Sequence, residues 1–389
     1  MPETNWSNDA DLDRLRQQQD PEADATVRAL MAEDAIAGAN LIFRTMQTSD
    51  DALHAADVPA PLRDFVTATQ ALPPWIDIER VRRGGRAFLC HVTTSALVLL
   101  ASSLPRGYAS PPLCRVLTVS NDLANNPYQR LLGVIQLLVN IAKPGAFEPG
   151  GLATVTAQKL RLLHAGVRTV VPKYRPDYRA RYGPPVNHED MLATLMAFSY
   201  LVVDGLRRLD MALSPQDEAD YYELWRVFAV MMGIHPEGRP HDASLVPATL
   251  DDAAIFYASY ARRHYTGPDE NPEGPILAQH NLEMMQHLVP PPLRAVGFMR
   301  APRIAMTQLQ TPEELARIGI EPDNDHRVIE RLSSAAVRVI GWGGEIAPPR
   351  FAELVSRVVM QGMINVGRDG EVTFIIPDSL AAMRGPGLV

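Results

Sequence analysis

Hydrophobic residues recur every three or four positions along most of this chain, which is the period of one face of an α-helix. Between residues 24 and 46, for example, Val27, Leu30 and Met31 begin such a series. The stretch 78–100 repeats the pattern, and its second half is apolar on most sides, so we expect this helix at the centre of the molecule. The same spacing, with prolines and capping residues at the boundaries, predicts further helices over residues 113–123, 127–142, 152–172, 191–209, 215–232, 250–263, 276–288, 291–305, 312–318 and 325–339.

The pattern as a whole indicates one large all-α domain. The prolines are spread through the connections between helices, and no shift in composition marks a domain boundary. We therefore expect a loosely held polar arm over residues 1–25, a helical domain over residues 26–340 and a C-terminal extension over residues 341–389. Within that extension, residues 371–377 have the composition of a strand.

The composition is typical of a soluble globular protein, with 46% hydrophobic and 21% charged residues. A net charge of −8 argues against a nucleic-acid partner. The longest apolar runs, residues 96–104 and 131–142, are shorter than the roughly 20 residues of a membrane-spanning helix. The polar start of the chain lacks the apolar segment of an export signal. We therefore expect a cytoplasmic protein without a membrane span.

Three residues with chemical potential lie on one stripe of the predicted helix 152–172. Arg161, His164 and Arg168 fall within roughly 60° of each other around a helix. Two neighbouring cations disfavour the imidazolium form, and neutral imidazole is the form that binds a metal. The arginines would then be free to pair with anions such as haem propionates. The alternative is a core histidine with two arginines that extend past it to the surface.

Two further polar residues also have two interpretations each. Arg130 lies in a largely apolar segment, where a buried guanidinium needs a partner, although near a helix start it can also reach solvent. His188 could be a metal ligand. Beside Glu189 and Asp190, however, it is more typical of a charge-paired histidine at a helix start.

Several segments occur in an order that is specific for one family. The strongest is the pattern R-x-x-H-x-x-x-R at residues 161–168, followed by residues 183–195. Other segments that match are residues 20–24 (Asp-Pro-Glu-Ala-Asp), 73–75 (Pro-Pro-Trp), 104–108 (Leu-Pro-Arg-Gly-Tyr), 221–233 and 290–295, together with Arg130. Over most of residues 20–330 the chain resembles the family of latex clearing proteins (rubber oxygenases) and MpaB-type oxygenases.

This resemblance implies an all-helical fold with a globin-like core and a haem b cofactor. It implies that His164 is the proximal ligand of the haem iron and that Arg161 and Arg168 belong to the surroundings of that site. It also matches Arg130 with an arginine on the distal side. Neither cysteine lies in a C-x-x-C-H motif, so we expect the haem to be held non-covalently.

The chain departs from the family pattern in ways that concern chemistry more than fold. Gly133 and Val134 occupy the positions of a distal lysine and threonine, and His188 stands in place of a glutamine. Residues 111–117 contain no carboxylate that could be the family's catalytic glutamate. We do not expect cleavage of polyisoprene, because a secreted enzyme that degrades a polymer would also need an export signal.

Two functions from different classes are compatible with these observations. The first is a haem-dependent oxygenase that acts on a small hydrophobic substrate, such as an unsaturated one. Dioxygen would bind opposite His164, and Arg130 would be the catalytic residue that positions or polarises it. The second is a non-catalytic haem protein that binds or senses a gas or stores haem, since a globin-like core does not by itself imply catalysis. A third interpretation keeps the fold without the cofactor.

Overall fold

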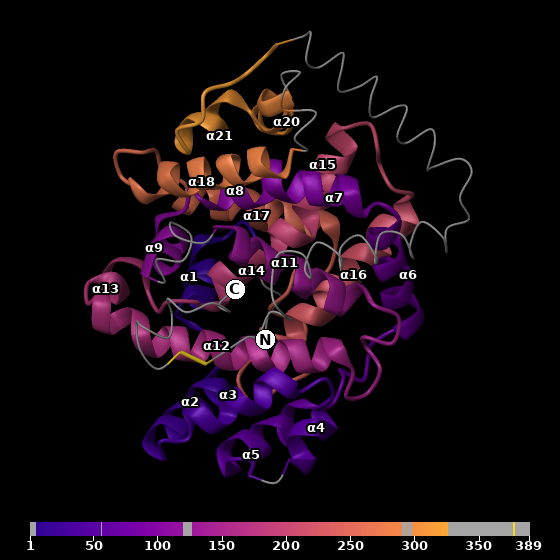
Figure 1. Cartoon of the computed structure of the whole chain (residues 1–389), viewed down its shortest axis with the longest axis vertical. Coiled ribbons are helices and arrows are strands. Elements are labelled where there is room, and N and C mark those ends of the chain that lie inside the picture. Colours follow the sequence, from indigo (N-terminus) through magenta and orange to yellow (C-terminus); the bar gives the residue numbers. More distant parts are fainter. Residues whose placement is uncertain are drawn as a thin grey trace.

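The computed structural model of the chain describes residues 5–55, 57–119, 127–289, 294, 298–325 and 376–377, and the regular elements in these residues are helices (Figure 1). The predicted all-α fold is confirmed. In chain order the helices are α1 (Asp9–Gln17), α2 (Pro21–Ala32), α3 (Ile36–Thr45), α4 (Ser49–His54), α5 (Ala60–Thr69), α6 (Ile78–Cys90), α7 (Val92–Val98), the π-helical turn η1 (Leu99–Ser103), α8 (Leu104–Gly107), α9 (Pro111–Val119), α11 (Pro127–Ala142), α12 (Leu152–Tyr174), α13 (Tyr178–Tyr182), α14 (His188–Phe198), α15 (Tyr200–Arg208), α16 (Pro215–Met231), α17 (Leu250–His264), α18 (Glu273–Leu288), the 3₁₀ turn η2 (Phe298–Arg300), α20 (Ala301–Leu309) and α21 (Pro312–Arg317).

The long helix α12 lies between two hydrophobic cores. The larger core includes Trp225 and Phe228 and is built mainly by α6 to α9, α11, α14 and α16 to α18. The smaller core includes Leu30, Phe43 and Leu62 and lies between α12 and the layer of helices α2–α5. Figure 1 shows this layer on one side of α12, with α8, α17 and α18 on the other. Because both sides of α12 are covered, 16 of its 23 residues are buried.

Three predicted helices are interrupted in the structure. The predicted helix 24–46 is divided into α2 and α3 next to Asp34, whose φ of 52° lies in the left-handed region. The predicted helix 78–100 breaks at His91 between α6 and α7. The predicted helix 191–209 breaks at Ser199 between α14 and α15. In each case the hydrophobic period continues through the break, so periodicity alone does not reveal it.

Residues 5–25 are packed against the domain, so the prediction of a loosely held arm is wrong for this part of the chain. Helix α1 buries Leu12 and Leu15 in the larger core. Asn8 caps the helix by accepting a hydrogen bond from the backbone N–H of Ala10. The polar composition of this segment belongs to the solvent-facing side of α1 and to side chains that form ion pairs. The proposed boundaries at residues 26 and 340 stay predictions.

The predicted helix 325–339 and most of the predicted strand 371–377 lie outside the described residues. Of that strand, Ile376 and Pro377 are described, and the backbone N–H and C=O of Ile376 both bond to the side chain of Asn40. In the described part of the chain, no single helix is long and apolar enough to cross a membrane. One bent pair, α6 with residues 94–107, reaches the required length and composition.

Candidate functional site

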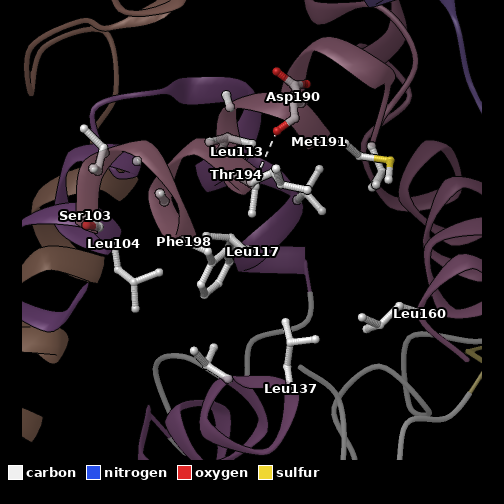
Figure 2. A pocket seen from close by; sticks show the side chains of 18 of the residues that line it. Ser103, Leu104, Leu113, Leu117, Leu137, Leu160, Asp190, Met191, Thr194 and Phe198 are labelled. Carbon is white, nitrogen blue, oxygen red and sulfur yellow. Dashed lines mark hydrogen bonds between the residues drawn. The ribbon is translucent and has the colours of Figure 1, made fainter. Parts of the chain in front are cut away.

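A cavity of about 290 Å³ lies in the larger core, directly against α12. Its walls come from η1, α8, α9, α11, α12 and α14 to α18. Figure 2 shows mostly apolar side chains around it, such as Met191 and Phe198, with a few polar groups that include Asp190 and Ser103. A largely apolar cavity with few polar groups is typical of a site for a small hydrophobic molecule.

His164 of α12 lines this cavity. Burial, and then the charge of Arg168, lower the pKa of His164 to about 3, so its imidazole is neutral near pH 7. The Nδ1 atom of His164 is buried and has no hydrogen-bond partner among the described residues. A neutral imidazole that is not committed to a structural hydrogen bond is able to bind a metal.

The local structure of α12 explains why His164 reaches the cavity. Leu160, Leu163 and Val167 lie four residues before, one before and three after His164, and all three also line the cavity. This face of α12 is therefore one wall of the site. The helix continues to Tyr174 and includes Pro172, at which the sequence predicted its end.

Arg161 and Arg168 form ion pairs with the start of α2. The Nε and Nη2 atoms of Arg161 donate to the two carboxylate oxygens of Asp20 at 2.6 and 2.9 Å, and Nη2 also donates to Glu22 at 2.8 Å. The Nε atom of Arg168 donates to Asp24 at 2.7 Å. Carboxylates of this chain therefore already pair with both cations. This arrangement favours a role in holding α12 in position over the predicted pairing with haem propionates.

The pair between Arg161 and Asp20 is ionised although both side chains are buried. Burial would raise the pKa of Asp20, but the adjacent Arg161 guanidinium lowers it below its ordinary value. Sequence reasoning did not find this pairing, because the partners are separated by 141 positions. Spacing gave no signal either, because residues 20 and 24 are about one helical turn apart while the two arginines are about two turns apart.

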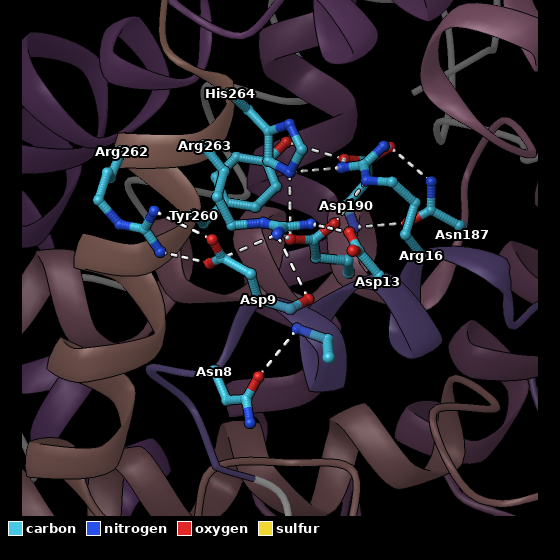
Figure 3. Close-up of polar contacts among 12 residues, drawn as sticks. Asn8, Asp9, Asp13, Arg16, Asn187, Asp190, Tyr260, Arg262, Arg263 and His264 are labelled. Atoms are coloured by element: carbon cyan, nitrogen blue, oxygen red, sulfur yellow. Dashed lines mark hydrogen bonds and ion pairs between the residues drawn. The ribbon is translucent and has the colours of Figure 1, made fainter.

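Asp190, in the first turn of α14, adds a carboxylate to the cavity wall. Arg16 of α1 and the hydroxyl of Tyr260 donate to its Oδ1 atom at 2.7 and 2.8 Å, and the side chain of Asn187 donates to Oδ2 at 2.8 Å. Figure 3 shows this cluster, in which Arg16 contacts both Asp190 of α14 and, at 3.1 Å, His264 of α17. Arg16 also pairs with Glu189. The carboxylate of Asp190 thus enters the cavity wall with its charge balanced.

His188 is the first residue of α14, and the prediction that it is charge-paired is wrong. Neither of its ring nitrogens has a hydrogen-bond partner in the described part of the chain. The neighbouring carboxylates of Glu189 and Asp190 bond to Arg16 instead. Burial lowers the pKa of His188 to about 3, so this ring is also neutral. His188 does not belong to the described wall of the cavity.

Arg130, the predicted catalytic residue, lies on α11, and its side chain is outside the described part of the structure. The described part of α11 nevertheless contributes to the cavity. Val134, which stands where the family has a threonine, and Leu137 both line it. Helix α11 therefore provides a wall of the site, as the resemblance implies.

Besides the hydroxyl groups of Tyr108 and Thr194, which belong to the matched segments, the cavity wall contains three that sequence reasoning did not identify. They belong to Ser103 of η1, Tyr257 of α17 and Tyr265, which follows α17 directly. The two tyrosine hydroxyls lie 2.8 Å apart. Nothing in the local sequence marks these positions, because a serine or tyrosine between apolar residues is common in buried helices.

Comparison with known proteins gives three matches. A family model described as "ER-bound oxygenase mpaB/B'/Rubber oxygenase, catalytic domain" matches residues 80–342. The "Rubber oxygenase" of Streptomyces sp. (strain K30) is 26% identical over 238 residues, which cover 60% of this chain and 56% of that protein. A solved structure of Latex Clearing Protein LCP in the closed state has a TM-score of 0.70 at 21% identity and covers 93% of this chain and 95% of that one. At this identity the structural match establishes the fold.

Proposed function

Because the chain belongs to the family of MpaB-type and rubber oxygenase catalytic domains, we propose that it is a haem b-dependent oxygenase that acts on a small hydrophobic substrate. The observation that carries this proposal is the neutral imidazole of His164 at the wall of an apolar cavity. The matched rubber oxygenase supports the class of reaction alone, because the match covers 56% of its length.

The residues around His164 fit a haem. A haem iron needs only one or two side-chain ligands, since the porphyrin supplies the other four nitrogens. Leu160, Leu163 and Val167 surround His164 with apolar surface suited to a porphyrin. One feature differs from the usual pattern, in which a metal-bound histidine donates its second N–H to a carbonyl or carboxylate. The Nδ1 atom of His164 has no such acceptor among the described residues.

The bound haem would supply an iron that binds and activates dioxygen. The protein would supply position and environment. The ion pairs of Arg161 and Arg168 with α2 fix α12, and with it the ring of His164. The apolar walls exclude water and bind the hydrocarbon part of a substrate. On α11 we propose Arg130 as the polar catalytic residue, because Val134, one turn later, lines the same cavity.

Isotope labelling tests the proposed reaction. Purified protein is incubated with unsaturated terpenes such as myrcene under ¹⁸O₂, and the products are analysed by mass spectrometry. We expect ¹⁸O-labelled product from the wild-type protein and little or none from His164→Ala or from samples under nitrogen. A protein that contains a full complement of haem but yields no labelled product from any terpene would instead be a haem- or gas-binding protein, and the oxygenase proposal would be wrong.

A further inference from the structure

Part of the cavity wall carries hydroxyl groups on elements other than α12. Ser103, Tyr257 and Tyr265 line the cavity, and they come from η1, α17 and the residue after α17. In Figure 1, α12 lies on one side of α11 and α14, while α8 and α17 lie on the other. The helices that carry these hydroxyls are thus different from α12, which carries His164.

The hydroxyl of Ser103 is available to form a hydrogen bond with a ligand. The side chain is 1% exposed, and its Oγ atom has no hydrogen-bond partner among the described residues. Figure 2 shows Ser103 at the cavity beside Leu104. Buried hydroxyls are nearly always hydrogen-bonded, so an unpaired one that faces a cavity indicates a partner on a ligand. Ser103 also lies in a π-helical turn, a feature that is frequent at functional sites.

Tyr257 and Tyr265 offer a second donor in the same cavity wall. Their hydroxyls bond to each other at 2.8 Å, and this contact uses one of their two protons. Burial raises the pKa of Tyr257 to about 12 and raises the pKa of Tyr265 well above its ordinary value, so both hydroxyls keep their protons. The residue after Tyr265, Thr266, donates its backbone N–H to the backbone oxygen of Ala109 at 2.9 Å. The end of α17 therefore lies next to the short segment 103–109, which begins with Ser103.

The charges around these hydroxyls favour a neutral ligand group. The carboxylate of Asp190 in the cavity wall is already paired with Arg16, so this pair offers an anionic ligand no free cation. Arg106 is not part of the described wall, and it already donates to Glu314 at 3.1 Å and to the backbone oxygen of Leu309 at 3.0 Å. The cavity thus presents O–H donors without a free cation in its described wall, which suits a hydroxyl or carbonyl oxygen better than a carboxylate.

We infer that Ser103 and the hydroxyl pair of Tyr257 and Tyr265 form a subsite for one neutral acceptor oxygen of an otherwise apolar ligand. This inference deepens the proposed function and rests on it, because the ligand is a substrate only if the protein is the proposed oxygenase. The substrate would be an apolar molecule with a single hydroxyl or carbonyl group, which is held at these hydroxyls. Its hydrocarbon part would then lie against the apolar walls of the cavity.

Calorimetric titration of the purified full-length protein tests this subsite with three probes of one carbon skeleton. They are geraniol, the hydrocarbon 2,6-dimethylocta-2,6-diene, and geranic acid at pH 7. We expect geraniol to bind more tightly than geranic acid. Ser103→Ala should weaken geraniol binding roughly 2- to 12-fold, the range for loss of one neutral hydrogen bond. Binding of the hydrocarbon should change less than twofold. The double variant Tyr257→Phe with Tyr265→Phe should show the same selective loss.

Thr194→Val is the matched control. Thr194 also lines the cavity, but its hydroxyl already donates to the backbone oxygen of Asp190 at 2.9 Å, so its loss should affect geraniol and the hydrocarbon equally. Ser103→Ala should not lower the thermal stability, because it removes a hydroxyl without a protein partner.

Three results would overturn the subsite: equal losses for both probes in the Ser103 and tyrosine variants, no measurable geraniol binding, or tighter binding of geranic acid than of geraniol. The titration does not require haem. A haem-free protein that still shows the selective loss would contradict the proposed function and support the subsite.

Discussion

His164 obtains its chemical properties from its surroundings. Burial and the charge of Arg168 keep its imidazole neutral, while Asp20 acts in the opposite direction. His188 is neutral for the same main reason, although it does not belong to the described cavity wall. Both rings are therefore unprotonated in the folded chain at pH values where free histidine becomes charged.

The difference between the pKa of these histidines in the folded and in the unfolded chain predicts a loss of stability in acid. The ordinary pKa of histidine is about 6.5, and the pKa of His188 in the folded protein is about 3. Between these values the unfolded chain binds a proton that the folded chain does not, so the free energy of unfolding decreases as the pH falls. For one such histidine the decrease from pH 7 to pH 5 is about 2 kcal/mol.

Replacement of His188 by glutamine, the residue implied by the family pattern, should reduce this decrease by about 2 kcal/mol. Urea denaturation at pH 7, 6 and 5 measures the effect. His287→Gln, which removes an exposed histidine, is the matched control. If the wild-type protein and His188→Gln lose stability equally over this range, His188 is not buried as a neutral ring.

Residue chemistry was predictable where it depends on local spacing. The stripe of Arg161, His164 and Arg168 identified the histidine that does line the cavity. The partners of the two arginines were not predictable, because Asp20 and Asp24 approach them only after α2 packs on α12. Periodicity shows which face of a helix is polar, but it does not show what lies against that face.

At the scale of elements, the ion pairs of Arg161 and Arg168 join α12 to the start of α2. Arg161→Gln would leave Asp20 buried without a counter-charge. Removal of one partner of a buried ion pair typically costs about 3–5 kcal/mol. We therefore expect a destabilised protein that also retains haem less well, as measured by denaturant unfolding and haem content.

Two further variants distinguish the effect of breaking the buried ion pair from the effect of removing any arginine. Arg161→Gln combined with Asp20→Asn should recover part of the stability, because no unpaired charge remains buried. Arg14→Gln removes an exposed partner of Asp11 and should have little effect. Full stability of Arg161→Gln alone would show that the pair does not hold α2 on α12.

The contact between α6 and α16 depends on a glycine. A Cβ atom at Gly84 would lie 2.2 Å from the backbone oxygen of Asp220, which is closer than any real contact allows. The side chain of Asp220 also accepts hydrogen bonds from Arg80 and Arg83 across the same contact. Helices α6 and α16 thus touch through their backbones at Gly84, and the hydrogen bonds of Asp220 hold them together at the same place.

Gly84→Ala should therefore force the two helices apart and destabilise the protein by at least the roughly 1–3 kcal/mol of an overpacked core. Gly267→Ala is the control, because a Cβ atom there meets no other atom within 4 Å. The midpoints of thermal or urea unfolding provide the comparison. Equal midpoints for the two alanine variants would contradict the close approach.

Helix positions were more predictable than helix ends. The apolar period located α16, α17 and α18 to within a few residues, since each has one continuous buried face. It did not reveal the breaks at His91 and Ser199, because the segments on either side of each break are apolar and buried in the same core. The π-helical turn that contains Ser103 follows the first of these breaks, so this part of the cavity wall could not be predicted either.

At the scale of the whole molecule, the cavity exists because helices far apart in the sequence meet around one face of α12. The residues that line it are spread between positions 100 and 284 of the chain. From α1, Arg16 also donates a hydrogen bond to Asp190 of the wall. The all-α class followed from composition and period. The position of the cavity depends on long-range packing that no single segment encodes, so it was available only through the resemblance to a family.

The most direct test of the central claim, that His164 is the protein ligand of a haem, is the absorption spectrum of purified wild-type protein and His164→Ala after incubation with haemin. The wild-type protein should retain about one haem per chain and show a Soret band. His164→Ala should lose most or all of its haem while its circular dichroism keeps the helical signal, because the buried Nδ1 atom of His164 has no hydrogen-bond partner among the described residues. Equal haem content and an unchanged spectrum in His164→Ala would contradict the assignment.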